Sequence, residues 1–390
     1  MLKLERKILE WVETHIFPLT ILAVTLAGIL IRYMLKDILS PDANSFLLPW
    51  YHTIKERGGL NGLYWQVGCY SILYQALIAV MTYLPIEPLY GYKILSIIFD
   101  YGMAIAIAVI TYSLSTGNRK QNALLAYALT LLCPIVFLNS AAWAQCDAMY
   151  VFFILVALLA FFQDRYHLSM ILFGLALSFK LQAVFTIPVF LFAYFVKKKF
   201  SILYFAWIPV MMCVTSIPGL LCGRSIKEVF LIYLDQTDYS PAMHLNYPSF
   251  WAIMSSSEYV TDAVALKNMA MLMAVAVLGV MMVYLVVHKI KLTSKNILYL
   301  SFLFTYTSIL FLPAMHERYG FCYEMLAIPI LFLNRKTIAL IVPLWFVTIS
   351  TYGHYLFAST TNLSVLAVIN VITFLLYWYV LWMDMKGQAL

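Results

Sequence analysis

Long apolar runs alternate with short charged segments along nearly the whole chain. A helix that crosses a bilayer needs about 20 mainly apolar residues, and the pattern divides into twelve such segments of unequal length. They lie near residues 16–35, 91–114, 122–140, 148–163, 168–180, 182–196, 200–221, 267–288, 296–313, 323–334, 337–353 and 361–383. The two segments that flank Lys180 and the run 323–334 are too short to cross as straight helices, so we expect neighbours to bury them or a wet cavity to adjoin them. The pattern predicts an all-α, polytopic membrane protein with about twelve segments, some of them short or broken.

Composition supports this class. Hydrophobic residues make up 64% of the chain and charged residues 11%, with a mean hydropathy of +0.87. A soluble domain carries roughly 25% charged residues, so a soluble globular protein is excluded. The first apolar run is too long for a removable signal peptide and lacks a small-residue cleavage site. No connecting segment is long enough for a core of its own, so we expect residues 1–390 to form one integral domain.

Basic residues indicate the orientation, because positive charge in short loops stays in the cytoplasm. With the N-terminus inside, the cytoplasmic set is Lys3, Arg6, Lys7, Arg119, Lys120, Arg165, Lys197, Lys198, Lys199, Lys289, Lys291, Lys295, Arg335, Lys336 and Lys386. Both termini are then cytoplasmic, in the plasma membrane, and residues 36–90, 141–147, 222–266 and 314–322 lie outside. The net charge of +7 reflects this anchoring to membrane lipids, and no nucleic-acid partner is expected.

Two outer loops, near 36–90 and 222–266, are much longer than the other connections, and long loops are usually functional. Within the first, residues 71–81 are apolar but short and bounded by Gly68 and Pro85, which favours a helix at the membrane interface. The outer cysteines Cys69, Cys146, Cys222 and Cys322 would face an oxidising compartment, but their spacing assigns no pair. Gly-rich phosphate loops and metalloprotease or nucleophile-elbow motifs are absent from the sequence.

Three polar clusters stand out at the ends of apolar segments. They are Asp42 with Pro49-Trp50-Tyr51, Trp143-Ala144-Gln145-Cys146-Asp147, and His316-Glu317-Arg318-Tyr319. Ionisable groups in such a chain are functional candidates by default. The orientation drawn from the basic residues places all three clusters on the same outer side, which favours one shared site.

Taken in order, these clusters, together with Phe46-Leu47-Leu48, Gly58-Gly59 and Phe179-Lys180-Leu181-Gln182, resemble the GT-C class of membrane glycosyltransferases. The similarity is spread over about residues 15–330 and is nearest to the bacterial branch related to the second mannosyltransferase of glycosylphosphatidylinositol-anchor synthesis. Relatives often carry Asn-Tyr-x-Pro-Pro where this chain has Cys69-Tyr70-Ser71-Ile72-Leu73-Tyr74. They also carry Gly where it has Ala144.

The resemblance implies an inverting hexosyltransferase, with mannose as the family's commonest sugar. It would move a sugar from a polyprenyl-phosphate donor to a glycan, lipid-linked or protein acceptor on the outer side. An acid of the first outer loop is the proposed general base in this class, and Asp42 matches it. One carboxylate suffices, because the lipid phosphate leaves without a general acid. The resemblance implies neither a cofactor nor a metal, and the first loop has no second acid at a metal-binding spacing from Asp42.

The remaining candidates each have a functional and a structural interpretation. Arg318 and His316 are expected to hold the donor phosphate with Glu317 orienting Arg318, or Glu317 and Arg318 simply form an ion pair. Lys180 contacts the phosphate as well, or pairs with Asp100. Asp147 contacts a substrate or makes a structural pair. Supporting contacts are expected from Trp50, Tyr51, Trp143, Gln145, Gln182, Asn246 and Tyr319.

For several of these residues a structural role is also open. Asp42 follows Ser40-Pro41 and could cap a helix. Trp143 and Gln145 could belong to an aromatic belt, and Asn246 could only pack its loop. Two other functions also stay open. One is a flippase or transporter of lipid-linked glycan, which would favour charges near the bilayer midplane and inverted repeats. The other is a surface-glycan polymerase or ligase.

Overall fold

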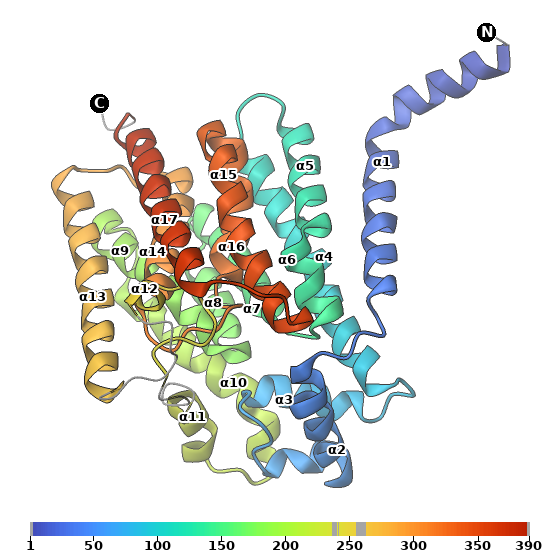
Figure 1. Cartoon of the computed structure of the whole chain (residues 1–390), viewed down its shortest axis with the longest axis vertical. Coiled ribbons are helices and arrows are strands. Elements are labelled where there is room, and N and C mark those ends of the chain that lie inside the picture. The colour runs from blue at the N-terminus through green and yellow to red at the C-terminus, as the bar shows by residue number, and fades with distance from the viewer. Residues whose placement is uncertain (1–2, 236–239, 241, 255–262, 388–390) are drawn as a thin grey trace.

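The structure is a computed structural model that describes residues 3–235, 240, 242–254 and 263–387. Within these residues the chain is helical and contains no β-strand, apart from two isolated bridges that join Leu245 and Asn246 to His316. Helices run side by side along one direction, and shorter helices cover one end of the bundle (Figure 1). The predicted all-α class is confirmed, and the hydropathy of the helices is that of a membrane protein.

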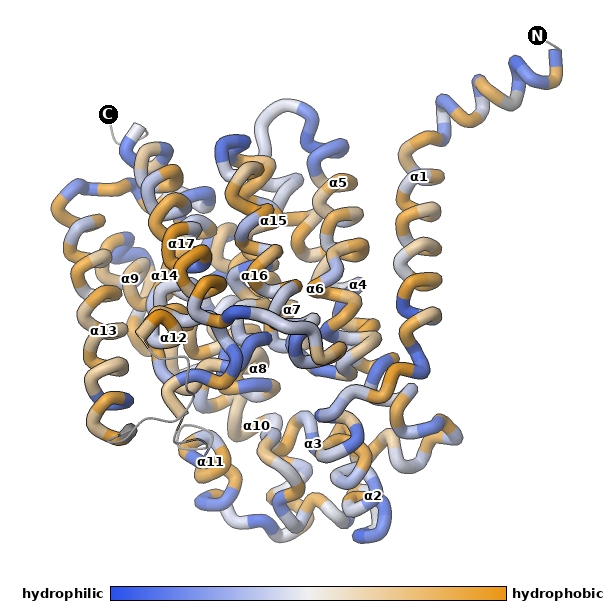
Figure 2. The backbone as a smooth tube through the Cα atoms, in the orientation of Figure 1, coloured by the Kyte–Doolittle hydropathy of each residue, from blue (hydrophilic) through white to orange (hydrophobic). Residues whose placement is uncertain are grey.

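Each of the twelve apolar segments coincides with one or more helices. They are α1 (Lys3–Met34), α4 (Pro88–Leu114), α5 (Arg119–Leu132) with α6 (Pro134–Phe137), α7 (Asp147–Phe162), α8 (Tyr166–Phe179), α9 (Ile187–Lys197), α10 (Trp207–Leu221), α13 (Ala263–Val287), α14 (Ser294–Phe311), α15 (Phe321–Leu333), α16 (Ile338–Phe357) and α17 (Leu363–Lys386). Figure 2 shows apolar residues along most of them.

Six of the helices in the described residues are long and apolar enough to cross a membrane alone. The pair Arg119–Leu132 and Pro134–Ala142 adds a seventh if it counts as one span bent by 44°. Pro134 lies at the break, where its ring cannot continue the preceding helix. The expected number of about twelve spans is therefore not confirmed. The short segments near Lys180 and at 323–334 are helices of 10–17 residues, as their sequence length predicts.

Both ends of the described chain lie at the same end of the bundle (Figure 1). The first part of α1 leans away from the other helices, and Pro18 lies inside this helix. Proline removes a backbone hydrogen bond and kinks a helix. The rest of α1 runs alongside the bundle, where its Arg32 reaches the buried Asp100 of α4.

The first long loop folds into a compact cap at the opposite end from the termini (Figure 1). It comprises η1 (Ala43–Leu47), α2 (Leu48–Glu56), η2 (Gly59–Tyr64) and α3 (Ile72–Met81). The predicted helix over 71–81 forms as α3, with most of its side chains buried. The second loop adds α11 (Ile226–Asp235) and α12 (Trp251–Met254); parts of its predicted range, 222–266, lie outside the described residues.

A buried arginine joins the two long loops. Arg224 donates hydrogen bonds to the backbone oxygen of Tyr64 (3.3 Å) and to the side-chain oxygen of Gln66 (2.9 Å). Its guanidinium thereby satisfies acceptors from the first loop, and charge-assisted bonds of this kind are stronger than neutral ones. The cap is consequently fixed to the segment that follows α10. All six cysteines are free thiols.

Candidate functional site

Asp42 is held by three hydrogen-bond donors from distant parts of the chain. Its Oδ2 accepts from Trp143 Nε1 (2.9 Å) and Gln145 Nε2 (2.6 Å), and its Oδ1 accepts from Tyr355 Oη (2.5 Å). The carboxylate makes no capping hydrogen bond to η1. Ser40 does that instead, because its Oγ accepts from the backbone N–H of Ala43 (3.1 Å). The helix-cap interpretation of Asp42 is therefore wrong.

A tight turn at Ala144 presents both neighbouring side chains to Asp42. Ala144 has φ +63°, in the left-handed region, which costs a non-glycine residue about 1–2 kcal/mol. The turn is fixed by the Gln145 N–H, which donates to the Asn139 carbonyl (2.9 Å), and by Ser40 Oγ, which donates to the Trp143 carbonyl (2.8 Å). This is the position where relatives of the resembled family carry glycine.

Asp147, the first residue of α7, is fully buried and pairs with Lys180. Its other oxygen accepts from Asn139 Nδ2 (2.9 Å). Lys180 follows the end of α8 and is 5% exposed. The alternative partner for Lys180, Asp100, is engaged elsewhere: it binds Arg32 (2.8 Å). The structure therefore corrects the expected Lys180–Asp100 pair to Lys180–Asp147.

Arg318 lies among three carboxylates. Its nitrogens are 3.7 Å from Asp42 Oδ2, 3.8 Å from Asp147 Oδ2 and 3.5 Å from Glu317 Oε1. Burial lowers the pKa of Arg318, but the three carboxylates outweigh it and hold this pKa well above its usual value. None of these distances is short enough for a good hydrogen bond, and within the described residues Arg318 Nε is buried without a hydrogen-bond partner. The guanidinium is thus held by the charge of three carboxylates, each at a distance longer than a good hydrogen bond.

His316 and Asn246 belong to a paired segment beside the cluster. The backbones of Leu245 and Asn246 form bridges to His316, and the Leu245 N–H donates to the Met315 carbonyl (2.9 Å). Asn246 has φ +61°, a conformation that asparagine tolerates better than most residues. His316 Nδ1 is 3.9 Å from Glu317 Oε2. Asn246 therefore helps to place the segment that carries His316, Glu317 and Arg318.

The other predicted residues lie at different distances from this cluster. Trp143 and Tyr319 have their rings under the Arg318 guanidinium, at 5.6 and 5.9 Å. Gln182 lies beside the buried hydroxyl of Tyr319, and burial raises the pKa of that hydroxyl. Trp50 reaches the cluster only through Tyr70. The Trp50 ring contacts the Tyr70 ring edge-on with 5.6 Å between their centres, and Tyr70 Oη donates to Gln145 Oε1 (3.3 Å).

Tyr51 is the predicted residue that the structure places in the apolar core. It is 2% exposed, within the cluster of buried residues that joins the cap to α4. Its ring contacts His52 edge-on, with 5.6 Å between the ring centres. We interpret Tyr51 as a packing residue of the cap.

Sequence reasoning missed two polar partners of the cluster. Tyr355 lies in α16, 313 positions from Asp42, and stacks on Trp143 with 4.6 Å between ring centres. Asn139 is a polar residue inside an apolar helix pair, and this alone marks it as a candidate functional residue. Tyr355 gave no comparable signal, because the chain has 28 tyrosines.

Access to the cluster is through a few partly exposed side chains. Asp42 is 14% exposed and Arg318 13%, whereas Asp147 and Glu317 are buried. The described residues contain no group of three or more His, Cys, Asp or Glu side chains arranged to hold a metal ion. Arg318 lies within 4 Å of all three carboxylates. The arrangement offers one partly exposed carboxylate, Asp42, held by three donors, and one partly exposed cation beside it.

Comparison with known proteins adds no assignment. No protein-family model matches the chain, and no curated protein matches it.

Proposed function

We propose that this protein is an inverting glycosyltransferase that uses a polyprenyl-phosphate sugar on the extracytoplasmic side of the membrane. The observation that supports this most is the convergence of the three polar clusters. The Asp42 carboxylate of the first loop lies within hydrogen-bond distance of Trp143 and Gln145 of the second cluster and within ion-pair distance of Arg318 of the third. The contacting residues of different clusters are more than a hundred positions apart in the sequence, and an aromatic belt or separate surface pairs would not require them to meet.

Asp42 is proposed as the general base. An ionised carboxylate has about four lone-pair sites; Oδ2 uses two for Trp143 and Gln145, and Oδ1 uses one for Tyr355. One site on Oδ1 therefore remains for the hydroxyl of an acceptor. As that oxygen bonds to C1 of the donor sugar, its proton passes to Asp42. The bond from C1 to the phosphate oxygen breaks, and its electron pair leaves with the polyprenyl phosphate.

Arg318 is proposed to bind the donor phosphate. A planar guanidinium can donate two parallel hydrogen bonds to a phosphate. Arg318 is 13% exposed, and the nearest oxygens of its three carboxylates are 3.5–3.8 Å away. His316, 26% exposed, lies beside Glu317 at the rim and adds a second cation when protonated. Lys180 is the less favoured phosphate ligand, because Asp147 binds it in the interior. We assign Lys180 and Asp147 to positioning Arg318.

A comparison of glycans tests this proposal. Lipid-linked and surface glycans would be analysed by mass spectrometry from cells with the wild-type chain, cells without it and cells with Asp42→Asn. Loss of one hexose from a defined glycan in both altered strains supports the proposal. Identical glycans in all three strains would sink it.

Transport of a lipid-linked glycan is the second candidate. The observation that favours it is a set of charged side chains buried inside helices, namely the Arg32–Asp100 pair and Glu324 of α15. Such groups can mark proton or substrate paths in transporters. Movement of a fluorescent polyprenyl-diphosphate glycan between leaflets, without any new glycosidic bond, would favour transport over transfer.

A further inference from the structure

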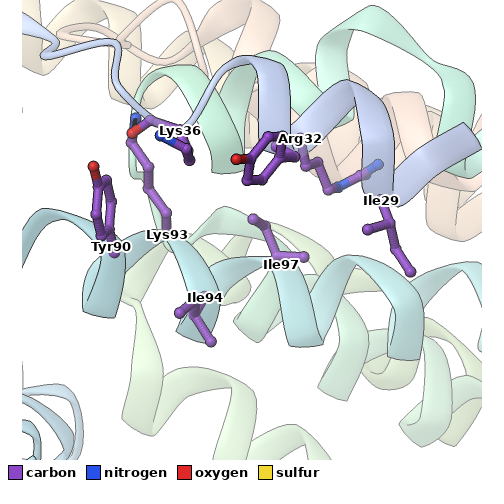
Figure 3. A pocket seen from close by; sticks show the side chains of 8 residues that line it. Ile29, Arg32, Lys36, Tyr90, Lys93, Ile94 and Ile97 are labelled. Carbon is purple, nitrogen blue, oxygen red and sulfur yellow. Dashed lines mark hydrogen bonds between the residues drawn. The ribbon is translucent and has the colours of Figure 1, made fainter. Parts of the chain in front are cut away.

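A groove between α1 and α4 lies outside the site described above. It has a volume of about 320 Å³. Its walls come from α1 with the turn that follows it and from α4, each at positions i, i+3, i+4 and i+7, so each side presents one stripe to the groove. The lining residues are Ile29, Arg32, Tyr33 and Lys36 on one side and Tyr90, Lys93, Ile94 and Ile97 on the other (Figure 3).

The inner wall of the groove is fixed by buried polar contacts. Arg32 pairs with Asp100 (2.8 Å) and donates to the carbonyls of Gly28 (3.1 Å) and Leu131 (3.0 Å). Its charged head is thus engaged with protein, and the groove meets mainly its apolar stem. Arg32 therefore closes the inner side of the groove without offering a free charge.

Lys93 fixes the end of α1 against α4. Its Nζ donates to the carbonyls of Leu35 (3.0 Å), Lys36 (2.7 Å) and Ile38 (2.7 Å). Three bonds use all the donors of an ammonium group. The width of the groove is accordingly set by the protein itself, which makes it a preformed site.

Lys36 lies at the mouth and is the available cation. Its Nζ contacts Asp37 (2.6 Å), but this pair is exposed, and exposed pairs contribute only about 0–1 kcal/mol. Asp37 keeps a second partner, because Tyr90 Oη donates to it (2.7 Å). Lys36 can therefore turn two or more donors to an anion without leaving Asp37 unbonded. None of the eight lining residues is acidic.

The side walls face outward from the protein. Ile29 is 51% exposed, Tyr33 65% and Ile94 47%. Both helices are long and apolar enough to span a membrane, so these walls meet lipid. A groove with apolar walls in hydrocarbon is filled by a chain, since water has no partners there.

We propose that this groove binds one anionic phospholipid, with an acyl chain along Ile29, Ile94 and Ile97 and its phosphate at Lys36. Tyr33 and Tyr90 flank the mouth, as tyrosines do at the membrane interface. The volume corresponds to about ten water-sized groups, which suits part of one acyl chain. This site is separate from the transferase proposal and stands without it.

Native mass spectrometry of the full-length chain tests the site. The detergent-solubilised protein would be mixed with phosphatidylglycerol, phosphatidylcholine or a polyprenyl phosphate, and the retained lipid counted. Ile94→Trp fills the groove, and Ile98→Trp is the matched control, because Ile98 is 61% exposed on the same helix but does not line the groove. We expect wild type and Ile98→Trp to retain one phosphatidylglycerol and Ile94→Trp to retain at least fivefold less.

Lys36→Gln tests the phosphate contact. It should retain lipid but lower the preference for phosphatidylglycerol over phosphatidylcholine by about fivefold, the effect of one interfacial lysine. Unchanged retention in Ile94→Trp, or an unchanged preference in Lys36→Gln, overturns the proposal. Retention of polyprenyl phosphate in place of phosphatidylglycerol overturns the choice of lipid. Should Ile94→Trp fail to fold, Ile94→Phe gives a smaller graded loss to measure.

Discussion

Replacing Asp42 by asparagine is the most informative single change to the proposed site. The substitution keeps the size of the side chain and one carbonyl oxygen, which can still accept from Trp143 and Gln145. The new amide can face Tyr355, whose hydroxyl oxygen is also an acceptor. What the variant loses is the ability to take a proton from an acceptor hydroxyl.

The expected loss of rate follows from the role of a general base. Removal of such a group commonly costs about 10²–10⁴ in rate, or about 3–5 kcal/mol of activation free energy. The expected loss of folding stability is smaller. A hydrogen bond to a charged group contributes about 1 kcal/mol more than a neutral one, so weakening the bonds at Asp42 lowers the free energy of unfolding by about 2–3 kcal/mol.

The assay measures transfer and folding separately. Purified Asp42→Asn would be compared with wild type for hexose transfer from a polyprenyl-phosphate sugar, for donor binding, and for thermal unfolding. Asp37→Asn is the control, since its carboxylate is in the same loop but 66% exposed. We expect donor binding within about threefold of wild type and a normal rate for Asp37→Asn. A transfer rate near wild type in Asp42→Asn would refute the assignment of the base.

Four further predictions concern the surrounding residues. Arg318→Lys should weaken donor binding about tenfold, because a point charge replaces the planar fork. Arg318→Ala also leaves three carboxylates without their common cation and should lower the melting temperature as well. Donor binding as tight as wild type in both variants would contradict the phosphate role. Lys180→Met alone should lower the free energy of unfolding by about 3–5 kcal/mol. Combining it with Asp147→Leu should restore part of that loss in a double-mutant cycle. Fully additive losses of unfolding free energy would show that the buried pair is unimportant. Ala144→Gly should stabilise the protein by about 0.5–1 kcal/mol, because glycine relieves the left-handed backbone at this position. Ala142→Gly, in the helical turn just before it, should destabilise the protein. Equal effects of the two changes in thermal melts would count against strain at Ala144. A cysteine at position 52 or 240 should react with a membrane-impermeant reagent from outside, as the distribution of basic residues requires, and labelling only from the cytoplasm would reverse the topology.

Helix positions could be predicted well from the sequence, and the number of spans could not. A run of apolar residues specifies a helix, but it does not say whether the helix crosses alone or is bent, as at Pro134, or is short and covered by neighbours, as α8 and α15 are. The same limit applies to α3, whose apolar sequence fits an interfacial helix although most of its side chains pack inside the cap.

The residues of the site were predictable where polarity interrupted an apolar context. Asp42, Asp147 and Arg318 were identifiable for that reason, and the structure brings them together. Pairing was harder to predict, because two buried acids, Asp100 and Asp147, were available for Lys180 and only the helix arrangement decides between them. Arg32 also interrupts an apolar helix and is a candidate for that reason, but only the packing of α1 against α4 shows that Asp100 is its partner. Tyr355 was overlooked because tyrosine is common in this chain and its role depends on a contact across more than three hundred residues.

The most direct test of the proposed function is the product formed by the purified protein in proteoliposomes. Polyprenyl-phosphate mannose and polyprenyl-phosphate glucose would be supplied as donors with a lipid-linked glycan acceptor, in the presence of EDTA, and the product analysed by mass spectrometry and NMR. The account predicts a new hexosyl linkage with the anomeric configuration opposite to that of the donor, formed by wild type and absent with Asp42→Asn. A retained configuration, a linkage that requires added Mg²⁺ or Mn²⁺, or movement of lipid between leaflets with no new linkage would contradict it.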